Sequence, residues 1–305
     1  MEKEITLSAR LSFHLQIDTS EVSISWRFFN FDQYQYCHQM KRIITNTTII
    51  KTLTTLVIYF GTALLLCSQS EEQLVIGQQP VYKVFRTGEP LVIDGEMNEM
   101  SWKKAEVVTF NYFYRGDKPA EKQSTEFRML WDNENLYLFF ECKDTSLTAR
   151  ETRFDARPYL DDCAEFFCVP VPDSIYMHFG FEVNLSKAAY DFIVLWKYYN
   201  DRTIFIRSYN PVYEVEVTCD GTINNESDKD NMWKMELAIP FAAFSDFYFV
   251  SRPAAGVRWA FQAVRQDRNF IDDRFRSTST LFPIYDIRKD VHQPSRFGLM
   301  EFIDK

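Results

Sequence analysis

The sequence predicts an all-β protein, an antiparallel β-sandwich of jelly-roll type with about ten strands in two sheets. Three observations lead to this prediction. Short segments alternate polar with apolar residues, turn residues separate these segments, and helical periodicity is scarce. The composition, 46% hydrophobic and 16% aromatic, supplies enough apolar side chains for a globular core and excludes a disordered chain.

The clearest local signal is a β-hairpin. Residues 125–131 and 136–142 each alternate, and the Asp- and Asn-rich stretch between them supplies turn residues. Further alternating runs follow along the chain. They cover residues 163–169, 175–184, 188–196, 203–209, 213–218, 232–239, 256–265 and 297–302. Trp131, Trp233 and Trp259 fall at inward positions of these runs, so we expect them in the core.

Helical and irregular segments are few. Residues 98–105 are compatible with about two turns of helix, and residues 240–244 with about one. Segments 219–231 and 266–295 lack a strand pattern and are the expected loops. The second is long enough to suggest a functional role.

Charge and composition exclude several classes of function. Acidic residues outnumber Lys and Arg by 43 to 34, and the net charge of −9 repels nucleic-acid phosphates. The 4 His residues are far apart, and the sequence has no Gly-rich phosphate loop, CxxC pair or Ser nucleophile elbow. We therefore expect no nucleic-acid partner, no cofactor and no metal site, with calcium at the oxygen-rich stretches 132–134 or 224–230 as an open alternative.

The N-terminal part carries a targeting signal. Lys41 and Arg42 precede the apolar stretch 53–67, which is shorter than the roughly 20 residues of a membrane-spanning helix. The pattern predicts a signal peptide, with a signal anchor as the alternative, and export in either case. Because signal peptides work near the start of a chain, Met40 is the expected initiator. The predicted organisation is an upstream extension with no assigned structure at 1–39, a signal peptide at 40–67, a linker at 68–80 and one β-sandwich domain at 81–305.

The end of the apolar stretch resembles a bacterial lipobox, which predicts lipidation of Cys67. Leu66 departs from that pattern, since a lipobox has Gly, Ala or Ser before the lipidated cysteine. Cleavage after Ser70 is the alternative. The expected location is the periplasm or the cell surface, with a lipid anchor to the outer membrane as one option, and membrane attachment is expected only through a lipid anchor or a signal anchor.

Seven short blocks, in a fixed order, extend over nearly all of residues 81–302. They are 91–99 with Trp102, 130–137, 162–167, 181–184, 233–240, Gly256 with Trp259 and Phe261, and 294–298. In this order and spacing they resemble a family 9 carbohydrate-binding module, in an exported protein of the Bacteroidetes type.

The resemblance implies a β-sandwich that clamps a terminal sugar between two aromatic rings. Rings pack on the apolar face of a pyranose, while its hydroxyls need planar polar partners such as carboxylates. Carried over block by block, the first clamp position is Tyr159, the second falls near Phe282 or Tyr285, and the acidic contact is Glu165. The position of a sugar-contacting arginine in the family is Glu182 in this chain.

We place the candidate site where the loop around residue 159 approaches the 266–295 segment. The candidate carbohydrate-binding residues are Tyr159, Asp162, Glu165, Arg265, Phe282 and Tyr285. The predicted function is non-catalytic binding of a poly- or oligosaccharide, in support of polysaccharide degradation by glycan-degrading enzymes on other chains. The alternatives are a glycoside hydrolase that uses acidic pairs such as 161–162 with Glu165, and a surface scaffold that has lost sugar binding.

Overall fold

The computed structural model describes residues 15–17, 22–24, 77–114, 122–172, 177–199, 202–245, 250, 252–269, 275–285 and 290–304. Contacts divide the chain into two units, residues 1–70 and 71–305. In the first unit, β1 (Leu15–Ile17) and β2 (Val22–Ile24) pair antiparallel. The predicted signal peptide at 40–67, including Cys67, lies outside the described residues. Within the part of the chain that is described, no helix has the length and apolar character needed to cross a membrane.

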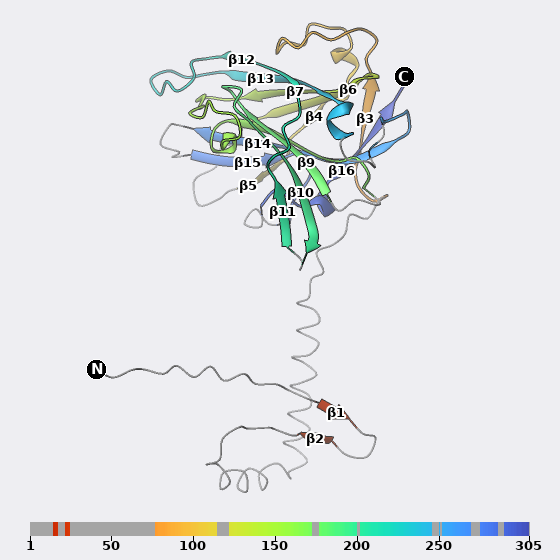
Figure 1. Cartoon of the computed structure of the whole chain (residues 1–305). Coiled ribbons are helices and arrows are strands. Elements are labelled where there is room, and N and C mark those ends of the chain that lie inside the picture. The colour runs from red at the N-terminus through yellow and green to blue at the C-terminus, as the bar shows by residue number, and fades with distance from the viewer. Residues whose placement is uncertain are drawn as a thin grey trace, which may run out of the picture. The chain divides into compact units, whose positions relative to one another are not determined.

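The second unit is built almost entirely of strands (Figure 1). The strands are β3 (Val81–Arg86), β4 (Val108–Thr109), β5 (Tyr112–Tyr114), β6 (Thr125–Trp131), β7 (Asn135–Lys143), β8 (Cys163–Val169), β9 (Met177–Asn184), β10 (Ala189–Tyr199), β11 (Arg202–Ile206), β12 (Glu214–Asp220), β13 (Met232–Pro240), β14 (Arg258–Asn269), β15 (Phe275–Thr280) and β16 (Gly298–Ile303). Short 3-10 helices are η1 (Trp102–Lys104), η2 (Pro158–Leu160), η3 (Phe241–Phe244) and η5 (Pro294–Arg296). The predicted hairpin is confirmed, because β6 pairs antiparallel with β7.

These strands form one mixed sheet. A continuous hydrogen-bonded path runs in the order β11-β10-β9-β8-β14-β16-β3-β6-β7-β13-β12, with β15 and β5 attached beyond β14 and β4 beside β6. The all-β class is confirmed, but the prediction of a purely antiparallel fold is wrong, because β16 pairs parallel with β3 and β3 pairs parallel with β6. The first strand of the unit thus lies between its last strand and the hairpin. The predicted division into two sheets with jelly-roll order is not confirmed.

The sheet curls around a single core. Phe244, directly after β13, contacts Phe179 of β9 with ring centroids 5.0 Å apart, although β13 and β9 are distant along the path of strands. Both halves of the sheet therefore bury their apolar side chains in the same cluster. Trp131, Trp233 and Trp259 all belong to this cluster, which confirms the prediction for the core tryptophans.

Two local predictions are wrong. The segment 266–295 is not a continuous loop, because β14 extends to Asn269 and β15 follows within it. The sequence of β15 is largely Ser and Thr, and hydrogen bonds rather than apolar packing hold it: Thr278 Oγ1 donates to Gln266 Oε1 at 2.6 Å. Residues 98–105 form only the short helix η1.

A second apolar cluster lies on the outer face of β8, β10 and β14, turned away from the core. Ile284, Val291 and Phe297, from the segments that follow β15, pack onto this face. Gly180 on β9 is essential to the packing, because a Cβ at this position would overlap the ring of Phe192. The absence of a side chain lets that ring lie flat on the sheet, where it forms part of the candidate site described next.

Candidate functional site

A cleft of about 510 Å³ opens on the outer face of the sheet. Its lining comes from helix η2, from the neighbouring strands β8, β9, β10, β11, β14 and β15, and from residues 290–292. Figure 1 shows several of these strands side by side in the second unit, with the β10–β11 hairpin at one edge. The sheet order alone therefore brings together side chains that are far apart in the sequence.

Two glutamates lie side by side on the sheet surface in this cleft. Glu165 of β8 and Glu182 of β9 are direct partners in the antiparallel register. Both line the cleft, yet they are only 1% and 4% exposed. Among the described residues, Oε2 of each carboxyl group has no hydrogen-bond partner. Buried carboxyl oxygens normally have partners, so these two oxygens can accept hydrogen bonds from water or from a bound molecule.

A row of polar groups leads from β14 to this pair. Arg268 Nη2 donates to Gln266 Oε1 at 2.5 Å, and Gln266 Nε2 donates to Glu165 Oε1 at 2.7 Å. Arg268 also donates to the backbone oxygens of Ser277, at 2.8 Å, and Tyr159, at 3.1 Å. These contacts fix the amide and the guanidinium in one orientation and leave Oε2 of Glu165 without a hydrogen-bond partner among the described residues.

Aromatic side chains form the opposite wall. The rings of Phe192 and Phe205 lie 5.6 Å apart, and the His292 ring lies 5.4 Å from Phe192 and 5.6 Å from Phe205. Tyr190 continues the row, 4.9 Å from Phe192. His292 is held in place by a hydrogen bond between its Nδ1 and Nε2 of His178, at 3.0 Å. The cleft thus has one apolar wall and one polar wall.

Burial changes the protonation of the acidic pair. It raises the pKa of Glu165 to about 7, although the Gln266 hydrogen bond and the charge of Arg268 act in the opposite direction. Burial also raises the pKa of Glu182 well above its usual range, and the charges of Glu165 and Asp290 add to this effect. A bound cation or a set of hydrogen-bond donors would stabilise the ionised pair. Burial lowers the pKa of His292, which favours the neutral ring.

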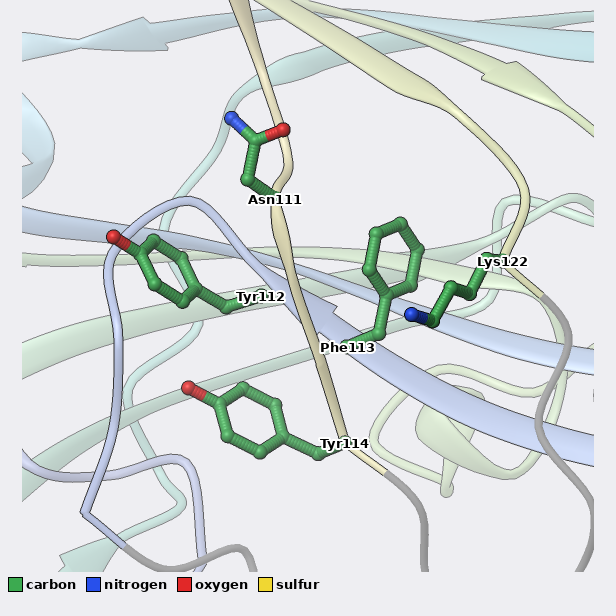
Figure 2. A pocket seen from close by; sticks show the side chains of 5 residues that line it. All are labelled: Asn111, Tyr112, Phe113, Tyr114 and Lys122. Carbon is green, nitrogen blue, oxygen red and sulfur yellow. The ribbon is translucent and has the colours of Figure 1, made fainter.

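A smaller hollow of about 250 Å³ lies at β5. Figure 2 shows the rings of Tyr112 and Tyr114 on one side of the strand, with Phe113 and Lys122 on the other. The Tyr114 hydroxyl accepts a hydrogen bond from the backbone N–H of Ile284 at 2.7 Å and so has a structural role. This hollow contains no buried carboxylate among its described lining residues, whereas the larger cleft contains two. The larger cleft is therefore the stronger candidate.

The carbohydrate family 9 binding domain-like profile matches residues 93–305, which include every lining residue of the cleft. The chain belongs to this family. No curated protein matches it. The family assignment confirms the coarse resemblance found in the sequence and agrees with the all-β fold.

Solved structures that are similar to this chain include proteins from Bacteroides and Caldicellulosiruptor. A candidate carbohydrate-binding protein from Bacteroides uniformis is 20% identical, with a TM-score of 0.54, over 73% of this chain and 97% of that one. A family 9 carbohydrate-binding module from Caldicellulosiruptor kristjanssonii is known in complex with cellotriose, at 19% identity and a TM-score of 0.49, over 74% of this chain and 95% of that one. Its complex with glucose gives 16% identity and a TM-score of 0.48, over 73% and 96% of the two chains.

In this family 9 domain the six predicted site residues do not form one site, since only some of them line the cleft. Tyr159 and Glu165 line the cleft. Phe282 lies in the core against Phe261, with ring centroids 5.1 Å apart, and Tyr285 is 47% exposed beside the guanidinium of Arg296. Neither Phe282 nor Tyr285 lines the cleft.

Asp162 and Arg265 belong to a buried polar cluster instead. Carboxyl oxygens of Asp144, Asp162 and Asp267 lie within 4.8 Å of one another. Arg265 contacts two of them, at 2.8 Å for Asp144 and 3.5 Å for Asp267, and so already supplies positive charge. Asp162 accepts the backbone N–H groups of Thr148 and Arg268, both at 2.7 Å. These contacts hold the loop after β7 against β14.

The sequence analysis did not include several residues that line the cleft. They are Tyr190, Phe192, Phe205, Arg207, Gln266, Arg268, Ser277, Thr278, Asp290, Val291 and His292, whereas Glu182 was named only as the position of the family's arginine. Glu182 alternates with core residues on a strand that the sequence predicts, whereas Gln266 and Arg268 follow the predicted strand 256–265 and continue its alternation. Polar residues at outward positions of neighbouring strands are the pattern that would have found them.

The stretches considered for calcium use their carboxylates within the chain. Asp132 Oδ1 accepts the backbone N–H groups of Glu134 and Asn135, both at 2.7 Å, and Oδ2 accepts the Tyr137 hydroxyl at 2.8 Å. Asp230 accepts the backbone N–H groups of Leu147 and Thr222, also at 2.7 Å. Calcium binding stays an untested prediction.

Proposed function

We propose that the cleft on the outer face binds a carbohydrate. The observation that carries this proposal is the pairing of an aromatic wall with a polar wall that holds two unpartnered carboxyl oxygens. A pyranose has an apolar face that packs on rings and hydroxyl groups that donate to carboxylates. Family membership and the sugar complexes of the Caldicellulosiruptor kristjanssonii module are consistent with this proposal.

The proposed role is binding without chemistry. Glycosidases place their two carboxyl groups on either side of the scissile bond. Glu165 and Glu182 are instead cross-strand partners on the same wall, where side-chain Cβ atoms are about 5 Å apart, so a sugar would contact both from one side. We further propose that the protein is exported, through the signal at 40–67, and holds glycan for degrading enzymes on other chains.

The test is a glycan panel followed by calorimetry of the binders with matched tyrosine variants. Tyr159→Ala removes a ring from the cleft, and we expect the affinity to fall about threefold to tenfold, because a stacked ring contributes about 0.5–1.5 kcal/mol beyond area burial. Tyr112→Ala removes an exposed ring from the smaller hollow and should leave the affinity unchanged. The reverse result would move the site to the smaller hollow.

The same samples test the alternatives. Products released from a bound oligosaccharide by the wild-type protein would point to a hydrolase. Failure of every glycan in the panel to bind would favour a scaffold without sugar binding and would overturn the proposal.

A further inference from the structure

Two buried acceptors of the cleft lie next to each other on the sheet, on Glu165 and Glu182. One amide N–H of Gln266 donates to Glu165 Oε1, and the Thr278 hydroxyl donates to Gln266 Oε1. The Arg268 guanidinium donates to the backbone oxygens of Asp267, Ser277 and Tyr159 and to Gln266 Oε1. Oε2 of Glu165 and Oε2 of Glu182, both buried, have no hydrogen-bond partner among the described residues. A ligand that matches this cleft must therefore bring donors.

We propose that the cleft recognises an amino sugar, a pyranose with a free, protonated amine that lies between Glu165 and Glu182. This inference rests on the proposed function and names its ligand class. The two carboxyl groups are neighbours in register, both almost fully buried, and both line the same cavity.

An ammonium group matches this arrangement better than a hydroxyl. It has three donors and no acceptor, so it can reach both unpartnered oxygens at once, whereas a hydroxyl has one donor. It also supplies the charge that two adjacent buried carboxylates lack, and hydrogen bonds between charged groups are shorter and stronger than neutral ones.

None of the other charged residues described around the cleft takes the place of a cation between Glu165 and Glu182. Arg268 is the nearest cation on β14, but its described hydrogen bonds go to oxygens other than those of the two glutamates. Arg207 and Asp290 are exposed at the rim and have opposite charges. Tyr190, the register partner of Glu182 on β10, offers an apolar ring and a neutral hydroxyl. No described lining residue therefore places a cation between the carboxyl pair.

The experiment compares three β-1,4-linked disaccharides that differ only in the group at C2: a free amine, a hydroxyl or an acetamide. Calorimetry uses the full chain at pH 7 and moderate salt, where an amine of pKa about 7.7–8.0 is mostly protonated. The variants are Glu182→Gln and Glu165→Gln. The matched control is Glu214→Gln, which removes the same charge from an exposed position on β12, at the far end of the sheet.

We expect the wild-type protein to bind the amine disaccharide about tenfold more tightly than the hydroxyl disaccharide, as expected for a charged hydrogen bond. Either cleft variant should reduce this preference to within about twofold, and Glu214→Gln should retain it. Thermal melting of each variant checks that it is folded, and two cleft variants keep the test valid if one of them unfolds.

Other outcomes overturn the inference in distinguishable ways. If the hydroxyl disaccharide, or another neutral glycan, binds as tightly as the amine, the amine proposal fails while carbohydrate binding stands. If Glu214→Gln abolishes the preference as the cleft variants do, the preference reflects the acidic surface and the proposal fails. If no glycan of any kind binds, the proposed function fails as well.

Discussion

Arg265 and Asp144 form an ion pair inside the protein. The Nη2 atom of Arg265 lies 2.8 Å from Oδ2 of Asp144, and the two side chains are 1% and 0% exposed. Asp162 and Asp267 complete the cluster around them. The Arg265 guanidinium therefore supplies one positive charge to a group of three buried aspartates, on the face of β14 opposite to the cleft.

Removal of this guanidinium should strongly destabilise the fold. We expect Arg265→Met to lower the free energy of unfolding by about 3–5 kcal/mol, because loss of one partner leaves the other charge buried without compensation. Urea unfolding measures this effect. The control is Arg258→Met on the same strand, where the ion pair with Glu301 is partly exposed and should contribute less than about 1 kcal/mol. Equal losses in the two variants would contradict the assigned role of the cluster.

Glu236 is expected to hold the segment around residues 94–102 against the sheet through hydrogen bonds. Its carboxylate accepts the backbone N–H groups of Asp94, at 3.1 Å, and Gly95, at 3.0 Å, and the indole N–H of Trp102, at 3.1 Å. Glu236→Ala leaves these donors without their acceptor and should cost at least about 2 kcal/mol, with a red shift of tryptophan emission.

The control for this prediction is the register partner of Glu236 on β12. Glu216 is 42% exposed and pairs with the surface residue Lys187. Glu216→Ala should change the free energy of unfolding by less than about 1 kcal/mol. If the two glutamates behaved alike, Glu236 would not be the attachment point.

Much of this fold could be predicted from local patterns. Strands such as β6 and β13 alternate clearly because one of their faces packs in the main core. β15 was missed because its Ser and Thr side chains are buried through hydrogen bonds, which leave no hydrophobic signal. The parallel position of β3 between β16 and β6 depends on pairing between the two ends of the unit, which alternation does not encode.

The residues of the candidate site were only partly predictable, because the face of a strand on which a side chain lies has to be known. The family resemblance pointed to Tyr159 and Glu165, which line the cleft, and also to Phe282, which is in the core. Strand parity could have separated Arg265 from the cleft residues, since it is six positions from the core residue Trp259 and therefore lies on the same face of β14. Phe205 gave no such signal, because its contribution depends on the curl of the sheet edge.

The Glu165 carboxyl should make stability depend on pH. Its pKa is raised to about 7 in the folded protein from 4.5, so the folded state holds a proton in this interval that the unfolded state releases. The stabilising contribution is complete below pH 4.5 and is lost as the pH rises through about 7. Each unit of pKa shift corresponds to about 1.4 kcal/mol.

Glu165→Gln removes this titration. Between pH 5 and pH 7 the wild-type protein should therefore lose at least about 1 kcal/mol more of its unfolding free energy than the variant does. Urea unfolding at both pH values measures the difference. Glu214→Gln, on an exposed position of β12, should keep the wild-type slope. A variant with an unchanged slope would show that Glu165 is not the group that titrates.

Variants of two exposed rings can distinguish sugar binding in the cleft from sugar binding at the clamp position that the family resemblance implies. Phe205 lines the cleft, 38% exposed, whereas Tyr285 is 47% exposed, outside the cleft, with the Arg296 guanidinium 3.4 Å from its ring centroid. Because both rings are partly exposed, truncation to alanine should cost little stability in either case. We expect Phe205→Ala to weaken glycan binding about threefold to tenfold, through loss of one packing face, and Tyr285→Ala to leave it within about twofold. Calorimetry with the tightest glycan of the panel makes the comparison. Weak binding by Tyr285→Ala together with normal binding by Phe205→Ala would place the sugar at the loop after β15, and the cleft on the sheet would then have to serve another purpose.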